Sequence, residues 1–371
     1  MRKHIYLDYN ATAPMLDSVR AAIIATLDAQ GNPSSVHQFG QAQRIRVEQA
    51  REHVAALVGA NSKQVIFTSG GTEANNLALS GVSTNTIIVS AIEHDSVLNC
   101  RRDVLVAPVE SSGVIDLVKL EKLIGDAPSP VLVSLMLANN ETGVIQPVAG
   151  AAEIVHKNGG ILHCDAVQAA GRVPVDIKSL GVDMMTLSAH KIGGPQGTGA
   201  LIYKDNIALK TQLRGGGQER GFRAGTENVI GIIGFGEAAL VAREKLADWK
   251  QILHMRDRFE HRITDCFGDD IKIFGQKEMR LANTTCIGLS GVSAETQVIA
   301  LDLAGIAVSA GSACSSGKVK SSHVLEAMGV EETLARSAIR VSLCPTTIDA
   351  ELDQFLEFYK SLRNRGVVYV A

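Results

Sequence analysis

The segment VLVSLML, residues 131–137, is a short apolar run with one serine and no charge, and the polar residues ANNETG follow it. A run of this length fits a β-strand that is buried on both faces, as strands of parallel sheets are. Similar runs occur before and after it: VIF (65–67), TIIVS (86–90), GILHC (160–164), DMMTLS (183–188) and GALIYK (199–204). Because amphipathic stretches separate these runs, the sequence predicts an α/β domain with a buried parallel sheet.

The helical pattern is clearest in QAQRIRVEQAREHVAALVG, residues 41–59, where apolar residues form one stripe and Gly59 is placed to end the helix. After about residue 250 the elements become more varied. The expected elements there are helices at 254–268, 294–303 and 349–364 and strands at 271–274, 283–289 and 305–309. This order is typical of a smaller α+β domain. We therefore predict a large domain at 15–250 and a small domain made of 1–14 and 251–371.

Composition argues against several classes of function. The net charge is -3 and aromatic residues make up 4%, so neither phosphate neutralisation nor base stacking supports nucleic-acid binding. No apolar run approaches the roughly eighteen residues of a membrane-spanning helix, and MRKHIYLDYNATAP lacks a signal peptide's apolar core. The six cysteines never form CxxC spacing, so neither a metal site nor a disulfide framework is predicted. We expect a cytoplasmic protein that binds neither membranes nor nucleic acid.

Polar residues follow five of the predicted strands. In an open parallel sheet, ligands bind beyond the carboxyl ends of the strands. The segments found there are TSGGTEANN (68–76), AIEHDS (91–96), ANNETG (138–143), DAVQ (165–168) and SAHKIGGPQG (188–197). Taken singly, each has an ordinary interpretation, such as a helix cap, a structural histidine, a polar turn or a surface lysine. Five such segments at one end of a sheet indicate a binding site.

The residue types in these segments point to one cofactor. Two glycines and Thr72 open a helix, whose free N–H groups and dipole suit a phosphate. Lys191, Asp165 and His94 complete a set without a metal-ligand pattern. Pyridoxal phosphate (PLP) needs this set, because its aldehyde bonds a lysine, its ring nitrogen pairs with a carboxylate and its phosphate binds a helix N-terminus.

The motifs also resemble a known family. SGGTEANN, EHDSV, NNETG, HCDAVQ, SAHKIGGPQG, RGGGQERGFRAGTEN and SAGSAC follow one another in an order similar to that of cysteine desulfurases of the NifS/IscS type. These are class V, fold-type I PLP enzymes. The resemblance implies a large domain with a mostly parallel seven-stranded sheet between helices, plus a smaller α+β domain. It also implies an isologous homodimer.

The resemblance assigns a role to each matching residue around the ring. Lys191 would form the Schiff base, Asp165 would face the pyridinium nitrogen, and Gln168 would donate to the ring hydroxyl oxygen. His94 would stack on the ring and move protons.

Three further groups follow from the same resemblance. The cofactor phosphate would be held by Gly71, Thr72, Ser188 and His190. Thr226 would reach across a dimer interface to the partner's phosphate. Asn140 and Arg340 would receive the substrate carboxylate, for which the planar guanidinium fork of arginine is suited.

The nucleophile implied by the resemblance is Cys314, within SAGSACSSG (309–317). The small residues around it favour a loop, because glycine and serine weaken helices and strands. The cysteine would take sulfur from L-cysteine as a persulfide, release L-alanine, and pass the sulfur to an acceptor such as an iron–sulfur scaffold protein. The alternative role for a cysteine, a small buried apolar residue, fits Cys164 and Cys286 better.

The sequence departs from the family at three places. Ser321 stands where relatives often have proline, Gln196 stands where they often have lysine, and the chain stops at GVVYVA without their longer tail. Loop stiffness and transfer to a scaffold are therefore less firmly implied than desulfuration. The alternative functions are a selenocysteine lyase or another class V aminotransferase or lyase, in which Cys314 is incidental, and a non-catalytic binding protein of a sulfur pathway.

Overall fold

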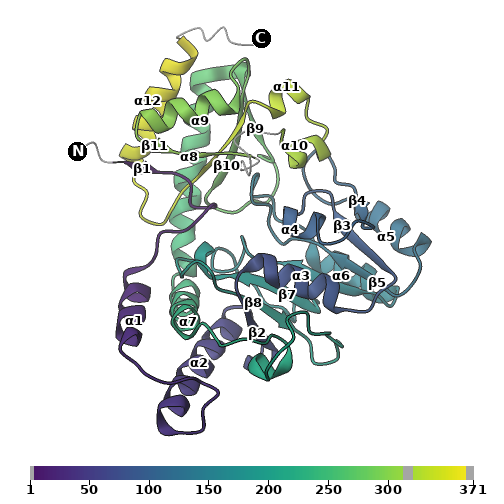
Figure 1. Ribbon diagram of the computed structural model, residues 1–371. Coiled ribbons are helices and arrows are strands. Elements are labelled where there is room, and N and C mark those ends of the chain that lie inside the picture. Colours follow the sequence, from purple (N-terminus) through teal and green to yellow (C-terminus); the bar gives the residue numbers. More distant parts are fainter. Residues whose placement is uncertain (1–3, 312–320, 365–371) are drawn as a thin grey trace.

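The computed structural model describes residues 4–311 and 321–364 (Figure 1). Its main feature is a seven-stranded sheet of order β2-β8-β7-β6-β5-β3-β4. The strands of this sheet are β2 (Val65–Thr68), β3 (Thr86–Ser90), β4 (Leu105–Ala107), β5 (Val131–Ser134), β6 (Ile161–Asp165), β7 (Met184–Ser188) and β8 (Gly199–Tyr203). All six apolar runs named above contribute a strand, and β4 is an additional edge strand.

The sheet is mostly parallel, as predicted, but β8 runs against both of its neighbours, β2 and β7. The apolar run alone could not reveal this reversal, because β8 is buried on both faces just as the parallel strands are. Its short connection to β7, residues 189–198, was the available signal, since parallel strands need a crossover of a dozen or more residues. Because β8 is antiparallel to both β2 and β7, β2 is parallel to β7 and therefore also to β3, β5 and β6. The carboxyl ends of these five strands therefore lie at one edge.

Helices cover both faces of this sheet, and β3, β5 and β7 are buried along their whole length. One face packs against α2 (Gln38–Leu57), α5 (Leu117–Asp126), α6 (Val148–Lys157) and α7 (Val229–Glu244), and the other against α3 (Gly71–Gly81) and α4 (Asp95–Leu98). Helix α1 (Asp17–Leu27) packs on α7. Helices α2 and α7 approach closely at Gly236, where a Cβ atom would lie 2.5 Å from the Cα of Ala50.

A second group of elements lies above this sheet in Figure 1, and α8 (Trp249–Phe267) extends from it toward α7. It contains an antiparallel sheet of order β12-β13-β10-β9 and the parallel pair β1-β11. The strands are β1 (Ile5–Tyr6), β9 (Ile271–Phe274), β10 (Thr284–Leu289), β11 (Ile306–Ala307), β12 (Ser309–Ala310) and β13 (Ala338–Ser342). The helices are α8, α9 (Ala294–Leu303), α10 (His323–Ala327), α11 (Glu332–Ala335) and α12 (Asp349–Asn364).

This second group has its own hydrophobic core, which includes Ile5 and Leu7 from the start of the chain and Phe355 and Tyr359 from α12. The α+β character expected after residue 250 is confirmed, although β13 was not foreseen as a strand. The domain limits themselves stay a prediction. Five short 3₁₀-helices complete the described structure: η1 (Ser62–Gln64), η2 (Ala189–Lys191), η3 (Gln218–Gly221), η4 (Leu246–Asp248) and η5 (Gly268–Asp270). Among the described helices, none has both the length and the hydropathy to pass through a lipid bilayer.

Candidate active site

A pocket of about 390 Å³ opens at the carboxyl ends of the parallel strands, beside the second group of elements. Ten of the predicted site residues line it: Gly71, Thr72, His94, Asn140, Asp165, Gln168, Ser188, His190, Lys191 and Arg340. Nine of them lie between residues 71 and 191, and Arg340 comes from the second group of elements. The strand-end prediction therefore located the pocket correctly, while the individual roles of these residues stay predictions.

Lys191 lies in η2, directly after β7. Its Nζ donates hydrogen bonds to the backbone oxygens of Asn10 at 2.7 Å and Ala11 at 2.8 Å. Burial, followed by the positive charges of Arg340 and Arg172, lowers the pKa of Lys191 to about 7. Near neutral pH a large share of this amine is therefore unprotonated and able to act as a nucleophile or base.

Asp165 ends β6 and accepts hydrogen bonds on both carboxylate oxygens. Oδ1 accepts from the backbone N–H of Val167 at 2.9 Å, and Oδ2 accepts from Asn75 Nδ2 at 2.8 Å. Among the described residues, the hydrogen bonds to this carboxyl come from N–H donors, an arrangement that suits an anion. Sequence reasoning did not single out Asn75, although it lies within the quoted SGGTEANN motif.

His94 is the N-cap of α4. Its Nδ1 accepts a hydrogen bond from the backbone N–H of Ser96 at 3.1 Å and lies 2.8 Å from Ser96 Oγ. The same hydroxyl lies 2.9 Å from Asn75 Nδ2. A continuous chain of hydrogen bonds thus connects His94 with Asp165.

The N-terminus of α3 borders a second hollow of about 350 Å³, lined in part by Gly71, Thr72, Ser188 and His190. These are the four residues predicted to hold a phosphate. The backbone at Gly70 is approached so closely by β8 that a Cβ atom on Gly199 would lie 2.6 Å from the Gly70 carbonyl carbon. This contact sets the first turn of α3 against the sheet edge.

His190 is held at this hollow by Thr12, whose Oγ1 lies 3.1 Å from its Nδ1. Burial, with the charges of Lys191 and Arg172, lowers the pKa of His190 to about 4. The ring is therefore neutral near pH 7 and can offer a hydrogen bond to an anion, but no positive charge.

Arg340, on β13, lies across the pocket from the strand ends. Its Nη2 donates to Asp8 Oδ1 at 2.8 Å, and its Nη1 donates to the backbone oxygen of Asn140 at 3.0 Å. Its buried Nε has no partner among the described residues. Asp8 also accepts from Ser309 Oγ at 2.8 Å. Asp8 therefore orients Arg340, a role that sequence reasoning missed.

Gln168 is oriented by Arg172, which is almost fully buried. Arg172 Nη1 donates to Gln168 Oε1 and to Asn10 Oδ1, each at 2.7 Å. The Gln168 Nε2 then points to the backbone oxygen of Asn10 at 3.0 Å. Burial lowers the pKa of Arg172 to about 10. Asn10 and Arg172 were not predicted, although YLDYNATAP was noted as a family-like segment.

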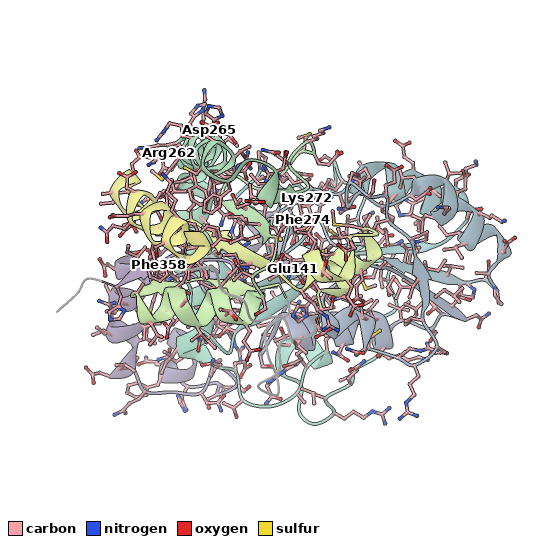
Figure 2. All side chains as sticks on the ribbon, turned by 90° about the horizontal axis from the view of Figure 1, so that it is seen from above. Glu141, Arg262, Asp265, Lys272, Phe274 and Phe358 are labelled. Atoms are coloured by element: carbon pink, nitrogen blue, oxygen red, sulfur yellow. The ribbon has the colours of Figure 1, made fainter. Side chains whose placement is uncertain are left out.

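Glu141 follows Asn140 in the turn after β5, is 2% exposed, and is labelled near the middle of Figure 2. Its Oε2 accepts a hydrogen bond from Ser322 Oγ at 2.5 Å. A Cβ atom on Gly311 would lie 2.4 Å from the same oxygen. Burial raises the pKa of Glu141. One carboxyl group therefore contacts both Gly311 and Ser322, on either side of residues 312–320.

One described site residue, Thr226, is not brought to the pocket. Thr226 lines a different hollow, beside Ser69 and Gly197, so it does not reach the pocket of its own chain. Cys314 lies outside the described residues. The expectation that Cys164 and Cys286 are buried is confirmed, since both are 0% exposed and burial raises both thiol pKa values.

Comparison with known proteins assigns the chain to a family. Residues 5–355 match the aminotransferase class-V family. The chain belongs to this family. It is 42% identical to cysteine desulfurase 2 of Trichormus variabilis, over 97% of this chain and 93% of that one. It also superposes on a NifS-like protein from Rickettsia africae, with a TM-score of 0.90, 36% identity, and coverage of 98% of this chain and 100% of that chain.

A third relative was solved with an amino acid. This structure, titled SspA in complex with cysteine, has a TM-score of 0.78 and 30% identity, and the match covers 93% of this class-V chain and all of that one. The predicted family, fold and cysteine desulfurase function are confirmed by these relatives. The alternative of a selenocysteine lyase or aminotransferase is not favoured. Enzymes of this class depend on PLP in general.

Proposed function

We propose that this chain holds PLP in the pocket at the strand ends and takes sulfur from L-cysteine, leaving a persulfide on Cys314 and releasing L-alanine. The single observation that carries the proposal is the position of Lys191, whose pKa is lowered to about 7, in one pocket with Asp165 and the N-terminus of α3.

The residues present fit PLP. Lys191 offers a reactive amine, Asp165 offers a carboxylate served only by N–H donors, and α3 offers free N–H groups beside Ser188 and His190. Asn75 Oδ1 and Arg340 Nε are buried polar atoms without partners among the described residues, which leaves hydrogen-bonding capacity around the pocket. When bound, PLP supplies an aldehyde that takes the substrate amine and a ring that stores the electron pair left at the α-carbon.

The described residues divide the remaining work. The Nζ of Lys191, unprotonated in part near pH 7, accepts the α-proton of the substrate. The Asp165 carboxylate would pair with the ring nitrogen of PLP and favour its protonated form. Arg340, oriented by Asp8, receives the substrate carboxylate together with Asn140.

Sulfur transfer then needs one nucleophile. The Cys314 thiolate attacks the sulfur of L-cysteine, so a sulfur–sulfur bond forms and the bond between sulfur and the β-carbon breaks. The electron pair of the broken bond stays with the carbon skeleton. The β-carbon takes up one proton, the α-carbon regains the proton held by Lys191, and the product leaves as L-alanine. The role of Cys314 rests on the sequence motif, and the flanking Gly311 lines the pocket.

A Cys314→Ala variant tests the proposal. It is expected to bind PLP normally, to lose persulfide formation, and to lower alanine production at least a hundredfold, because the sulfur acceptor is removed. Mass spectrometry of the peptide bearing residue 314 after exposure to L-cysteine measures the added sulfur, and alanine is measured in solution. Lys191→Ala serves as the matched comparison, since it should lose the borohydride-sensitive yellow colour as well.

Persistent turnover in Cys314→Ala would instead favour a class V aminotransferase or lyase. A colourless wild-type protein that does not react with L-cysteine would favour a binding protein.

The wider setting is also proposed. A homodimer is supported by Thr226, which does not line the pocket of its own chain, and by exposed apolar side chains on and between α1 and α2, namely Ile24, Leu27, Val36, Phe39 and Ile45. The persulfide sulfur would pass to an acceptor protein such as an iron–sulfur scaffold. The cytoplasmic setting and the two-domain division stay predictions from the sequence.

A further inference from the structure

We propose that Asn75 and Ser96 are positioning residues that fix His94 with its proton on Nε2 and connect it to Asp165. The inference deepens the proposed function and rests on it for the identity of the bound molecule. The hydrogen bonds themselves do not depend on the proposed function, because they are present in the protein without any bound molecule.

The first step is the direction of the bonds at His94. A backbone N–H can only donate, so the 3.1 Å contact from Ser96 N requires an unprotonated Nδ1 on His94. The neutral imidazole has one proton, and that proton must therefore be on Nε2. The backbone at the start of α4 therefore favours one of the two tautomers of His94, and the Ser96 hydroxyl offers a second donor to the same nitrogen.

The second step concerns Asn75, which is 1% exposed. The Asp165 carboxylate only accepts hydrogen bonds, so the Asn75 atom that lies 2.8 Å from it must be the amide nitrogen. That nitrogen has a second hydrogen, which points to Ser96 Oγ at 2.9 Å. The orientation of this buried amide is therefore set by the charge beside it.

The third step connects the hydrogen bonds of His94 with those of Asn75. Ser96 Oγ accepts from Asn75 and keeps a single hydrogen of its own. That hydrogen is left for His94 Nδ1, which lies 2.8 Å away. The chain of bonds runs from His94 through Ser96 and Asn75 to Asp165, and every link has a defined donor.

The consequence is a division of roles between two residues that line the same pocket. Neutral His94 offers an N–H donor and no free lone pair, so it hydrogen-bonds a group bound there and does not remove a proton from it. Lys191 is left as the base. A shift of Asn75 would disturb both the carboxylate and the histidine.

The test uses the PLP-loaded enzyme labelled with nitrogen-15 in histidine, and the same protein without PLP. Long-range nitrogen–proton NMR distinguishes the two tautomers, and the His94 signal is assigned by its loss in His94→Gln. We expect wild type to show a protonated Nε2 and an unprotonated Nδ1 at His94. Asn75→Ala and Ser96→Ala should both increase the Nδ1-protonated fraction, and Ser96→Thr should restore the wild-type pattern.

A second measurement distinguishes the effect of substituting Asn75 from that of substituting Ser96. The pH midpoint of the visible band of bound PLP reports the surroundings of Lys191 and Asp165. Asn75→Ala should shift it, while Ser96→Ala should leave it unchanged, because Asp165 keeps its Asn75 partner. Both variants should lower kcat for sulfide release about tenfold, a size typical of coupling within one hydrogen-bond network. Asn76→Ala, the next residue on α3, is the control and should change none of these values.

A protonated Nδ1 at His94 in wild type would overturn the inference, as would an Asn75→Ala variant with unchanged NMR and visible signals. If Asn75→Ala does not fold, the partly exposed Ser96→Ala decides the tautomer question by itself. Neither spectroscopic signal needs turnover of L-cysteine. Failure of the proposed function, seen as absent persulfide in wild type, is therefore distinguishable from failure of this inference.

Discussion

Burial, Arg340 and Arg172 together lower the pKa of Lys191 to about 7, from an ordinary value of 10.5. Burial disfavours the ammonium form because it removes water, and the two guanidinium groups repel it. Asp8 and Asp165 act in the opposite direction. The balance leaves the amine reactive at a pH where a surface lysine is fully charged.

This shift predicts how PLP uptake depends on pH. The neutral fraction of Lys191 increases as the pH rises through its pKa, so the rate of uptake by cofactor-free protein should increase with pH, with a midpoint near 7. Stopped-flow measurement of the visible band gives the rate. Arg340→Met removes one repelling charge and should move the midpoint to higher pH. A midpoint near the ordinary lysine value in wild type would contradict the prediction.

At this scale the sequence predicted the residues that directly follow strands, because strand ends are readable from apolar runs. It missed the residues whose importance lies in long-range contacts. Asn10 bonds Thr284 and Asn283, and Asp8 bonds Arg340, over separations of more than 270 residues. Local patterning contains no signal for such partners. Asn75 was within a quoted motif, but only the structure shows which way its amide faces.

At the scale of elements, the sequence predicted the strand positions closely and a mostly parallel sheet, but not which strand is antiparallel. Strand β3 begins and ends where the apolar run TIIVS does. The run VLVSLML is longer than its strand, because β5 ends at Ser134 and the chain continues as a buried loop. Apolar patterning measures burial, which strands and buried loops share. It does not measure direction, so it could not identify β8 as the antiparallel strand.

The turn after β5 contacts two parts of the second group of elements. Asn140 faces Arg340 through its backbone oxygen, and the next residue, Glu141, contacts Ser322 and Gly311. The contact with Arg340 and the contacts with the two segments that flank residues 312–320 are therefore made by neighbouring positions. Since Ser322 Oγ also accepts from Leu325 N as the N-cap of α10, its own hydrogen is committed to Glu141.

The Gly311 contact is testable by its coupling to Glu141. Gly311→Ala should lower the free energy of unfolding by about 1–3 kcal/mol, because the new methyl group overlaps a buried carboxyl oxygen. Adding Glu141→Ala should recover part of this loss, since the carboxyl is gone. Adding Glu141→Gln, which keeps the size, should not. Urea unfolding of wild type, the three single variants and the two double variants measures the effect, and strictly additive changes would argue against the contact.

At the scale of the whole molecule, exposed apolar residues gather at one end of the chain's first two helices. Phe39 and Ile45 lie on α2, Ile24 and Leu27 lie on α1, and each is more than half exposed. Both helices lie at the lower left of Figure 1, away from α5 on the right. Such a gathering of apolar side chains is typical of a surface that another protein covers.

We predict that this surface holds two copies together. The wild-type protein should sediment as a dimer, and Phe39→Ser with Ile45→Lys should produce monomers, because a buried charge and a lost aromatic contact weaken an interface strongly. Monomers should also bind PLP less tightly, since Thr226 does not reach its own pocket. Val118→Ser on α5, equally apolar and 80% exposed, is the control. A monomeric wild type would refute the dimer.

The hydrogen bonds that join Asn10 and Tyr9 to Ser342 have a consequence during translation. The Asn10 N–H donates to Ser342 Oγ at 3.0 Å, and the Tyr9 N–H donates to the Ser342 backbone oxygen at 3.2 Å. The backbone oxygens of Asn10 and Ala11 in turn accept hydrogen bonds from Lys191 Nζ. Ribosomes release the amino terminus first. The Lys191 amine can take up its position only after residue 342 has left the ribosome. A polypeptide truncated before that point would therefore lack a complete active site and would release no reactive sulfur.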